Sequence, residues 1–156
     1  SKIKFDNVLI FNGVFEQSFL SNFSTKQFDK IFNINLKIPL LVTKLCISEK
    51  ILNKNSAIYF ISSLAALEPQ IGNSLYAISK VALNFANKIL HLEQKERHLR
   101  FNCISIGVLE SKMGNKVIKS IPLISKKTKL VKIDYIKKKF KKILSSKKLN
   151  GKNIII

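Results

Sequence analysis

Hydrophobic residues along this chain fall into short continuous runs separated by longer stretches in which they recur at helical spacing. The continuous runs cover residues 7–11, 57–61 and 101–106, and a fourth run, 152–156, follows an Asn-Gly pair. Runs of this length, apolar at nearly every position, are typical of strands buried on both faces of a sheet. The pattern therefore predicts four strands.

The stretches between these runs carry helix signals. Ser24 and Gln27 have the spacing of a capping box, and apolar residues at helical intervals follow to about residue 52. Similar spacing predicts a second helix over residues 73–96 and a third beginning near Ile133. Residues 108–131 are Lys-rich and irregular, which suits a mobile loop or short helices.

The elements alternate as strand, helix, strand, helix, strand, helix and strand, without an internal repeat or an interdomain linker. This order indicates a single α/β domain over residues 1–156, with a parallel sheet and right-handed crossovers. In such sheets ligands bind beyond the carboxyl ends of the strands. We therefore expect the chemistry at that edge.

Composition narrows the class of protein. Hydrophobic residues make up 46% of the 156 residues and charged residues 24%, which argues against disorder. The longest apolar runs are interrupted by Lys37 and Lys44 and fall short of the about 18 residues that span a bilayer. No secretory signal is visible, and Cys46 and Cys103 are isolated, so we expect a cytoplasmic protein without a metal site, a disulfide framework or a membrane partner.

The net charge of +19 raises the question of an anionic partner. The basic residues are 26 Lys and only two Arg, and Arg is the usual residue for specific contacts to bases and phosphates. Residues 112–156 carry 15 of the lysines and a single acid, Asp134. This distribution favours a solvated surface over a specific nucleic-acid reader, and nonspecific polyanion binding remains the alternative.

Three residues near the expected carboxyl edge form a recognisable spacing. Tyr76 and Lys80 lie four residues apart at the start of the second helix, so they point to the same side of it. Ser63 follows the second strand, thirteen residues before Tyr76. This arrangement resembles the short-chain dehydrogenase/reductase family, whose signature is a Ser about thirteen residues before Tyr-x-x-x-Lys.

Further segments extend the resemblance over nearly the whole chain. Asn35, in Asn-Ile-Asn-Leu, matches the family's catalytic Asn, and residues 100–107 resemble its Arg-Val-Asn-x-Ile-x-Pro-Gly strand. The resemblance implies a three-layer Rossmann-like sheet of which this chain carries the C-terminal part, about four strands with flanking helices. It implies a homo-oligomer through helices 24–52 and 73–96.

The resemblance also assigns roles. It makes Asn35, Ser63, Tyr76 and Lys80 the catalytic residues of an NAD- or NADP-dependent oxidoreductase acting on a small carbonyl or alcohol. Tyr76 would be the general acid or base, with its pKa lowered by the Lys80 ammonium. The implied cofactor-binding residues are Asn12, Gly13, Tyr76, Lys80, Gly107 and Ser111. The implied substrate pocket consists of Ser63, Leu64, Ile71, Leu75, Leu109 and Met113.

Pro39 bears on the role of Asn35. Proline lacks the amide that would bond the Asn35 carbonyl in an α-helix, so we expect a kink there. In the family the corresponding carbonyl binds a water that relays protons to the Lys. We therefore predict that Pro39 frees the Asn35 carbonyl for that water.

The glycine pattern leaves three functions open. None of the five glycines forms the Gly-x-x-x-Gly-x-Gly turn that holds the pyrophosphate in this family, so the chain resembles an N-terminally truncated member with impaired cofactor binding. The first possibility is the oxidoreductase itself. The second is an inactive relative that serves as an assembly partner, and the third is a basic polyanion-binding protein.

Overall fold

The computed structural model describes residues 3–120 and 130–156. Four parallel strands form one sheet in the order β1-β2-β3-β4. The strands are β1 (Phe5–Ile10), β2 (Leu52–Ser63), β3 (Arg100–Ile106) and β4 (Asn153–Ile155). The predicted α/β architecture with a parallel sheet is confirmed, and β2 begins five residues earlier than its apolar run.

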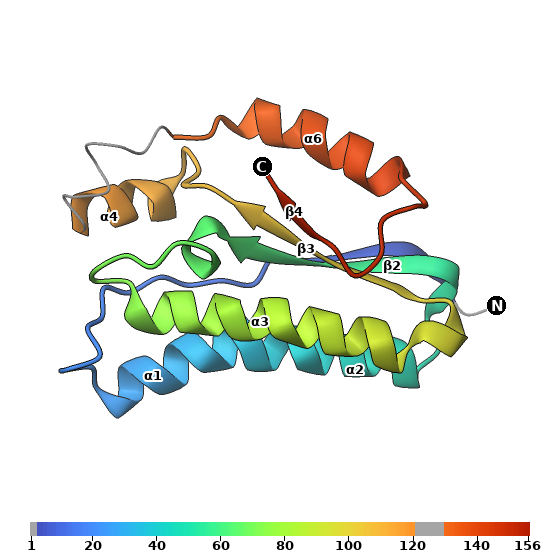
Figure 1. The fold of residues 1–156 in the computed structure, drawn as a ribbon, viewed down its shortest axis with the longest axis horizontal. Coiled ribbons are helices and arrows are strands. Elements are labelled where there is room, and N and C mark those ends of the chain that lie inside the picture. Colours follow the sequence, from blue (N-terminus) through green and yellow to red (C-terminus); the bar gives the residue numbers. More distant parts are fainter. Residues whose placement is uncertain (1–2, 121–129) are drawn as a thin grey trace.

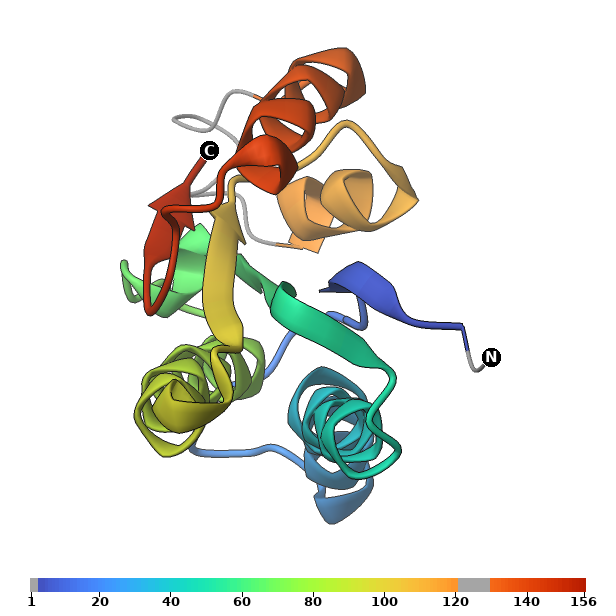
Figure 2. The same cartoon turned by 90° about the vertical axis from the view of Figure 1, so that its right-hand side faces the viewer.

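Helices cover both faces of this sheet and complete three layers (Figures 1 and 2). One layer holds α1 (Thr25–Phe32), α2 (Ile38–Ser48) and α3 (Ser74–Glu93). The opposite side holds α4 (Lys112–Ser120) and α6 (Ile133–Ser145). The expected irregular stretch 108–131 thus includes the helix α4, while residues 121–129 lie outside the described part.

The alternation of side chains along the strands builds two cores. Ile58 and Phe60 of β2 face α2 and α3, whereas Ala57 and Tyr59 of the same strand face α6. Because successive side chains point to opposite faces, a strand covered on both sides must be apolar at every position. This explains why the strands are continuous apolar runs in the sequence.

The long helical stretch 25–48 contains an irregularity at the expected place. Ser24 caps α1 by accepting a hydrogen bond from the Gln27 amide at 3.1 Å, as predicted, but the Gln27 side chain donates to the Gln17 carbonyl instead of reaching back. Asn33–Lys37 form a π-helical turn between α1 and α2, and Pro39 lies in the first turn of α2. The wider turn accommodates the missing proline amide.

The same stretch passes a test for a membrane-spanning helix. Thr25–Ser48 is long and apolar enough to cross a bilayer by length and composition alone, although only short runs within it are free of charge. Buried helices of soluble proteins pass this test too, and here α1 and α2 pack against α3 and β2.

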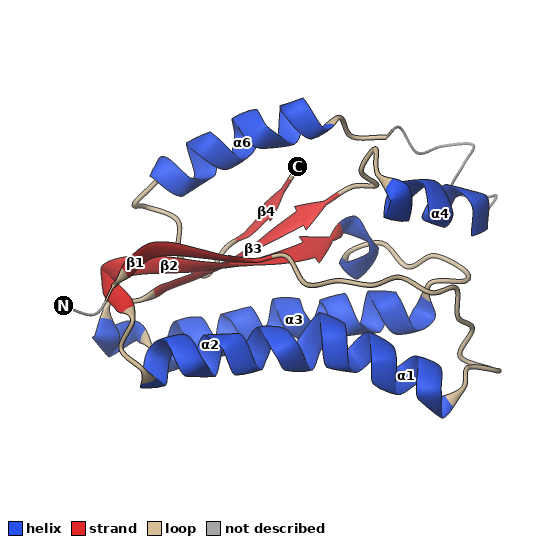
Figure 3. Ribbon diagram, turned by 180° about the vertical axis from the view of Figure 1, so that it is seen from behind, coloured by secondary structure: helices blue, strands red, loops and turns tan. Residues whose placement is uncertain are grey.

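The carboxyl ends of the strands and the amino end of α3 meet at one edge of the sheet (Figure 3). The loops after β1, β2 and β3 all emerge there, beside α4. This arrangement brings Ser63 and Tyr76, which are thirteen residues apart in the sequence, to the same edge.

Candidate active site

A cavity of about 500 Å³ opens at this edge. Its wall is formed by the loops that follow β1, β2 and β3, by the first turns of α3 and by α4. Among its residues are Ser63, Tyr76 and Lys80, so the structure brings the three signature residues to one cavity, as their spacing predicts.

Ser63 lies close enough to the Tyr76 hydroxyl to lower the pKa of the phenol. Ser63 ends β2, where its Oγ also accepts a hydrogen bond from the Ala65 amide at 3.2 Å, so its hydroxyl hydrogen is left free to donate. Burial raises the pKa of Tyr76 above its usual value of 10, and Ser63 offsets only part of that effect. The predicted net lowering of the Tyr76 pKa is therefore wrong for this structure, in which the phenol is protonated at neutral pH.

The surroundings of Lys80 explain why the Tyr76 pKa is not lowered as predicted. Its Nζ lies 5.9 Å from the centre of the Tyr76 ring and donates to the carbonyls of Asn12 at 3.2 Å and Ile61 at 2.8 Å. Burial lowers the pKa of Lys80 to about 8, although the buried Cys103 thiol beside it acts in the opposite direction. Its charge is thus satisfied by two backbone carbonyls, and burial dominates the pKa of both side chains.

Asn35 is fully buried in the π turn and does not line the cavity. Its Oδ1 accepts from the Val14 amide at 2.8 Å, and its Nδ2 donates to the Val14 carbonyl and to Ser79 Oγ, both at 3.0 Å. Ser79 Oγ in turn donates to the Tyr76 carbonyl at 2.7 Å. The side chain therefore joins the loop after β1 to the helix that carries Tyr76, a role that spacing alone did not indicate. The water relay through the Asn35 carbonyl stays a prediction.

The residues expected to bind a cofactor lie in the same wall. Asn12, Gly13, Gly107 and Ser111 all line the cavity beside Lys80. A Cβ added to Gly13 would lie 3.4 Å from Lys80 Nζ, so glycine leaves room next to the ammonium. Ser111 also has a local structural role, because its Oγ accepts from the Gly114 amide at 3.1 Å at the start of α4.

The expected substrate residues divide into two groups. Leu64, Leu109 and Met113 line the cavity with Ser63. Ile71 lies instead on an exposed loop, and Leu75 is buried in the protein core. On a helix, Leu75 points about 100° away from its neighbour Tyr76, which directs it into the interior.

Phe15 is a cavity residue that the sequence analysis missed. It is 5% exposed, and its ring meets the Tyr76 ring edge to face, with centroids 5.6 Å apart. Val117 of α4 packs against the same pair. No local pattern marks Phe15, since its importance arises from the way the loop after β1 folds back onto α3.

Comparison with known proteins agrees with this geometry. The sequence model of the family described as short chain dehydrogenase matches residues 5–121. The chain belongs to the short-chain dehydrogenase/reductase family. It is therefore a member of an oxidoreductase family, as its Ser63, Tyr76 and Lys80 spacing suggested.

Curated relatives of this chain are similar to it over only part of their own length. Dehydrogenase/reductase SDR family member 4 of Pongo abelii is 32% identical over 107 residues, which cover 67% of this chain and 38% of the relative. The 3-oxoacyl-[acyl-carrier-protein] reductase FabG of Rickettsia conorii is 27% identical over 126 residues, covering 75% of this chain and 52% of the relative. The chain thus spans about two-fifths to half the length of these relatives.

Solved structures support the fold of this chain. A short-chain dehydrogenase family protein from Francisella tularensis superimposes with a TM-score of 0.86 at 18% identity, covering 99% of this chain and 70% of that one. A 4-hydroxyisoleucine dehydrogenase complexed with NADH gives a TM-score of 0.78 at 22% identity, with 97% and 66% covered. The Rossmann-like three-layer arrangement is confirmed by these likenesses.

Proposed function

We propose that this chain carries the catalytic centre of an NAD(P)-dependent oxidoreductase that reduces a carbonyl or oxidises an alcohol, with Tyr76 as general acid and base. The observation that carries the proposal is the convergence of Tyr76, Ser63 and Lys80 on one cavity. Such a cavity at the carboxyl edge of a parallel sheet is where α/β proteins bind their ligands.

The protonation of Tyr76 suits the reducing direction. When hydride reaches a carbonyl carbon, the oxygen gains negative charge and takes up a proton. Tyr76, with its pKa raised by burial, holds that proton at neutral pH. The Ser63 hydroxyl, oriented by the Ala65 amide, donates to the same oxygen and stabilises its developing charge. In the oxidising direction Tyr76 takes the proton back.

The residues beside Tyr76 fit the nicotinamide and ribose part of the cofactor. Lys80 uses two of its three N–H donors on backbone carbonyls, which leaves the third for a ribose hydroxyl. Gly13 keeps the space next to that ammonium open, and Ser111 and Asn12 add polar groups to the same wall. The nicotinamide, when bound, supplies the hydride. NAD and NADP are equally compatible with these residues.

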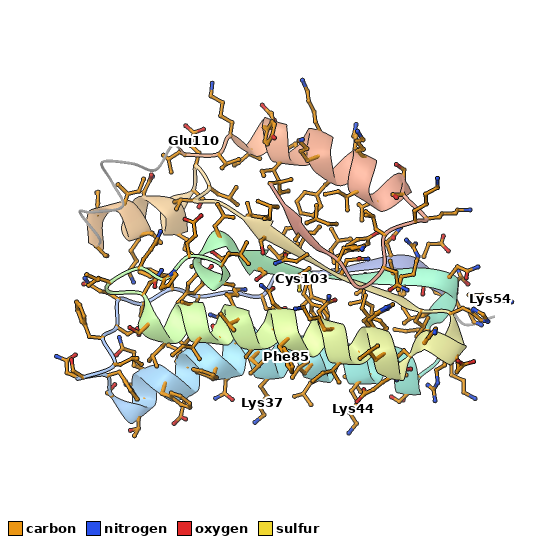
Figure 4. All side chains as sticks on the ribbon, in the orientation of Figure 1. Lys37, Lys44, Lys54, Phe85, Cys103 and Glu110 are labelled. Atoms are coloured by element: carbon orange, nitrogen blue, oxygen red, sulfur yellow. The ribbon has the colours of Figure 1, made fainter. Side chains whose placement is uncertain are left out.

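We also propose that the chain assembles with a second copy through α2 and α3. These helices expose apolar side chains on the side turned away from the sheet, and Figure 4 shows Phe85 on this side with Lys37 and Lys44 at its margin. The exposed residues of this face are Ile38, Leu41, Leu45, Ile78, Val81, Phe85, Ile89 and Leu92. An apolar surface of this kind is unusual on a monomer and typical of an interface.

Cofactor binding and turnover test the proposed function together. NADH and NADPH are titrated into the intact protein and their fluorescence is followed. Their oxidation is then measured with a panel of small aliphatic and aromatic ketones. We expect saturable binding of one nucleotide and oxidation that depends on the ketone. Absence of binding at millimolar nucleotide would contradict the proposal and favour the inactive assembly partner.

A further inference from the structure

The first turn of α3 is capped by a residue from a distant segment. Asn73, at the N-cap position, makes no side-chain hydrogen bond to the helix. Ser18 caps the helix in its place, because its Oγ accepts from the Leu75 amide at 3.1 Å and its carbonyl accepts from the Ser74 amide at 3.2 Å. The Ser18 amide donates to the Gly72 carbonyl at 3.0 Å. Two of the four amides that a helix leaves unpaired are thus satisfied by Ser18.

Ser18 is held firmly enough to act as a fixed cap. Its side chain is 3% exposed, and its backbone pairs with Asn73 as an isolated parallel bridge. The two segments joined in this way are the loop after β1 and the loop before α3. Tyr76 is the residue that follows Leu75, so the capped amide lies directly beside the proposed general acid.

The same loop reaches the other residues of the site. Residues 12–18, which we term the positioning segment, contact three of them. The Asn12 carbonyl accepts a hydrogen bond from Lys80 Nζ at 3.2 Å. The Val14 amide and carbonyl pair with the side-chain amide of Asn35 at 2.8 and 3.0 Å. The Phe15 ring packs against the Tyr76 ring, with the centroids 5.6 Å apart. One short segment therefore touches Lys80, Asn35, Tyr76 and the start of α3.

We propose that Ser18 is a positioning residue for the oxidoreductase reaction, which fixes the amino end of α3 so that Tyr76 stays partly buried in the cavity wall with Ser63. The proposal rests on the proposed function for its catalytic consequence. The structural part of the proposal can be tested without activity, because the burial that raises the pKa of Tyr76 depends on where the first turn of α3 lies. If the first turn frays, Tyr76 moves toward water, and its pKa falls back toward 10.

The test compares Ser18→Ala with Ser18→Thr, which keeps an oxygen at the γ position, and with Ser21→Ala. Ser21 is an exposed residue of the same loop and serves as the matched control. The intact proteins are labelled with tyrosine carrying ¹³C at Cζ, and the Tyr76 signal is assigned by its loss in Tyr76→Phe. Its titration gives the pKa of the phenol without cofactor. The kcat and KM values for ketone reduction are measured alongside.

We expect Ser18→Ala to lower the Tyr76 pKa toward its usual value and to reduce kcat by about tenfold with little change in KM, since small misplacements of a reacting group are costly. We expect the Tyr76 pKa and the kcat of Ser18→Thr to stay close to those of the unmodified protein, and Ser21→Ala to change neither value. A Ser18→Ala protein with the Tyr76 pKa and kcat of the unmodified protein would overturn the proposal.

A second measurement covers the case in which Ser18→Ala does not fold. Hydrogen exchange in the unmodified protein reports directly on the Leu75 amide. We expect this amide to be protected as well as the amides inside α3, because it is paired with Ser18 Oγ. Exchange at the rate of an open loop would refute the cap. If the protein lacks oxidoreductase activity but shows the expected protection and Tyr76 titration, the proposed function fails and the positioning role stands.

Discussion

The Asn35→Ala variant removes three hydrogen bonds from a fully buried site. In the unmodified protein Asn35 bonds the Val14 amide, the Val14 carbonyl and Ser79 Oγ at 2.8 to 3.0 Å. Its side chain is 0% exposed, so water does not replace the lost partners. The change therefore leaves both partly buried Val14 backbone groups without their side-chain partner.

The cost follows from the number of bonds. A buried hydrogen bond contributes about 1 kcal/mol, and an unpaired buried group adds further cost, so we expect the free energy of unfolding to fall by about 3 kcal/mol. In a domain of this size that corresponds to a thermal midpoint lower by about 6–12 °C.

Urea unfolding followed by far-UV circular dichroism measures these differences. Asn33→Ala is the matched control, because Asn33 lies in the same π turn with an exposed side chain. We expect the control to change stability by less than about 0.5 kcal/mol. An Asn35→Ala protein as stable as the Asn33→Ala control would refute the role of Asn35 as the link between the loop after β1 and α3.

Three further predictions concern charge, assembly and the cavity wall. Lys80 has a pKa of about 8 in the folded protein and about 10.5 when unfolded, so the unfolded chain binds more protons and stability should rise as the pH goes from 8 to 9. Above pH 9 the Cys103 thiol, whose pKa burial raises to about 12, acts in the opposite direction. Lys80→Met should remove that rise, as urea titrations at several pH values would reveal, and an unchanged slope would contradict the assignment. Phe85→Glu places a charge on the apolar face of α2 and α3 and should dissociate the oligomer in light scattering, whereas Lys138→Glu, at an exposed site of α6 on the other side of the sheet, should not. A monomer before mutation would contradict the interface. Gly114→Ala would put a Cβ 1.8 Å from the Leu109 carbonyl oxygen, so we expect the substitution to displace α4. The KM for the ketone should then rise by about tenfold or more. An unchanged KM would show that this wall does not contact substrate.

The site was largely predictable because its main features follow from local rules. Polar or small residues end β2 and follow β1 and β3 within two positions. Because the carboxyl ends of parallel strands meet at one edge, Ser63 and Tyr76 were expected to come together there. The helix spacing also fixed Lys80 on the same side as Tyr76. These inferences required no knowledge of how loops pack.

Features that depend on loop packing were not predictable. Ser18 caps α3 across 57 positions of the chain, and no residue spacing announces such a partner. Phe15 and the side chain of Asn35 acquire their roles through the same loop. The pKa of Tyr76 was predicted with the wrong sign because burial, a tertiary property, raises it by more than the neighbouring Ser63 lowers it.

The rate of carbonyl reduction by Tyr76→Phe tests the account most directly. Phenylalanine keeps the ring against Phe15 and removes only the hydroxyl that Ser63 contacts, while Tyr135→Phe removes an exposed hydroxyl on α6 as the control. With saturating NAD(P)H, we expect kcat to fall by about 10²- to 10⁴-fold in Tyr76→Phe and to stay unchanged in Tyr135→Phe. Equal kcat values in the two variants would contradict the assignment of Tyr76 as the proton donor.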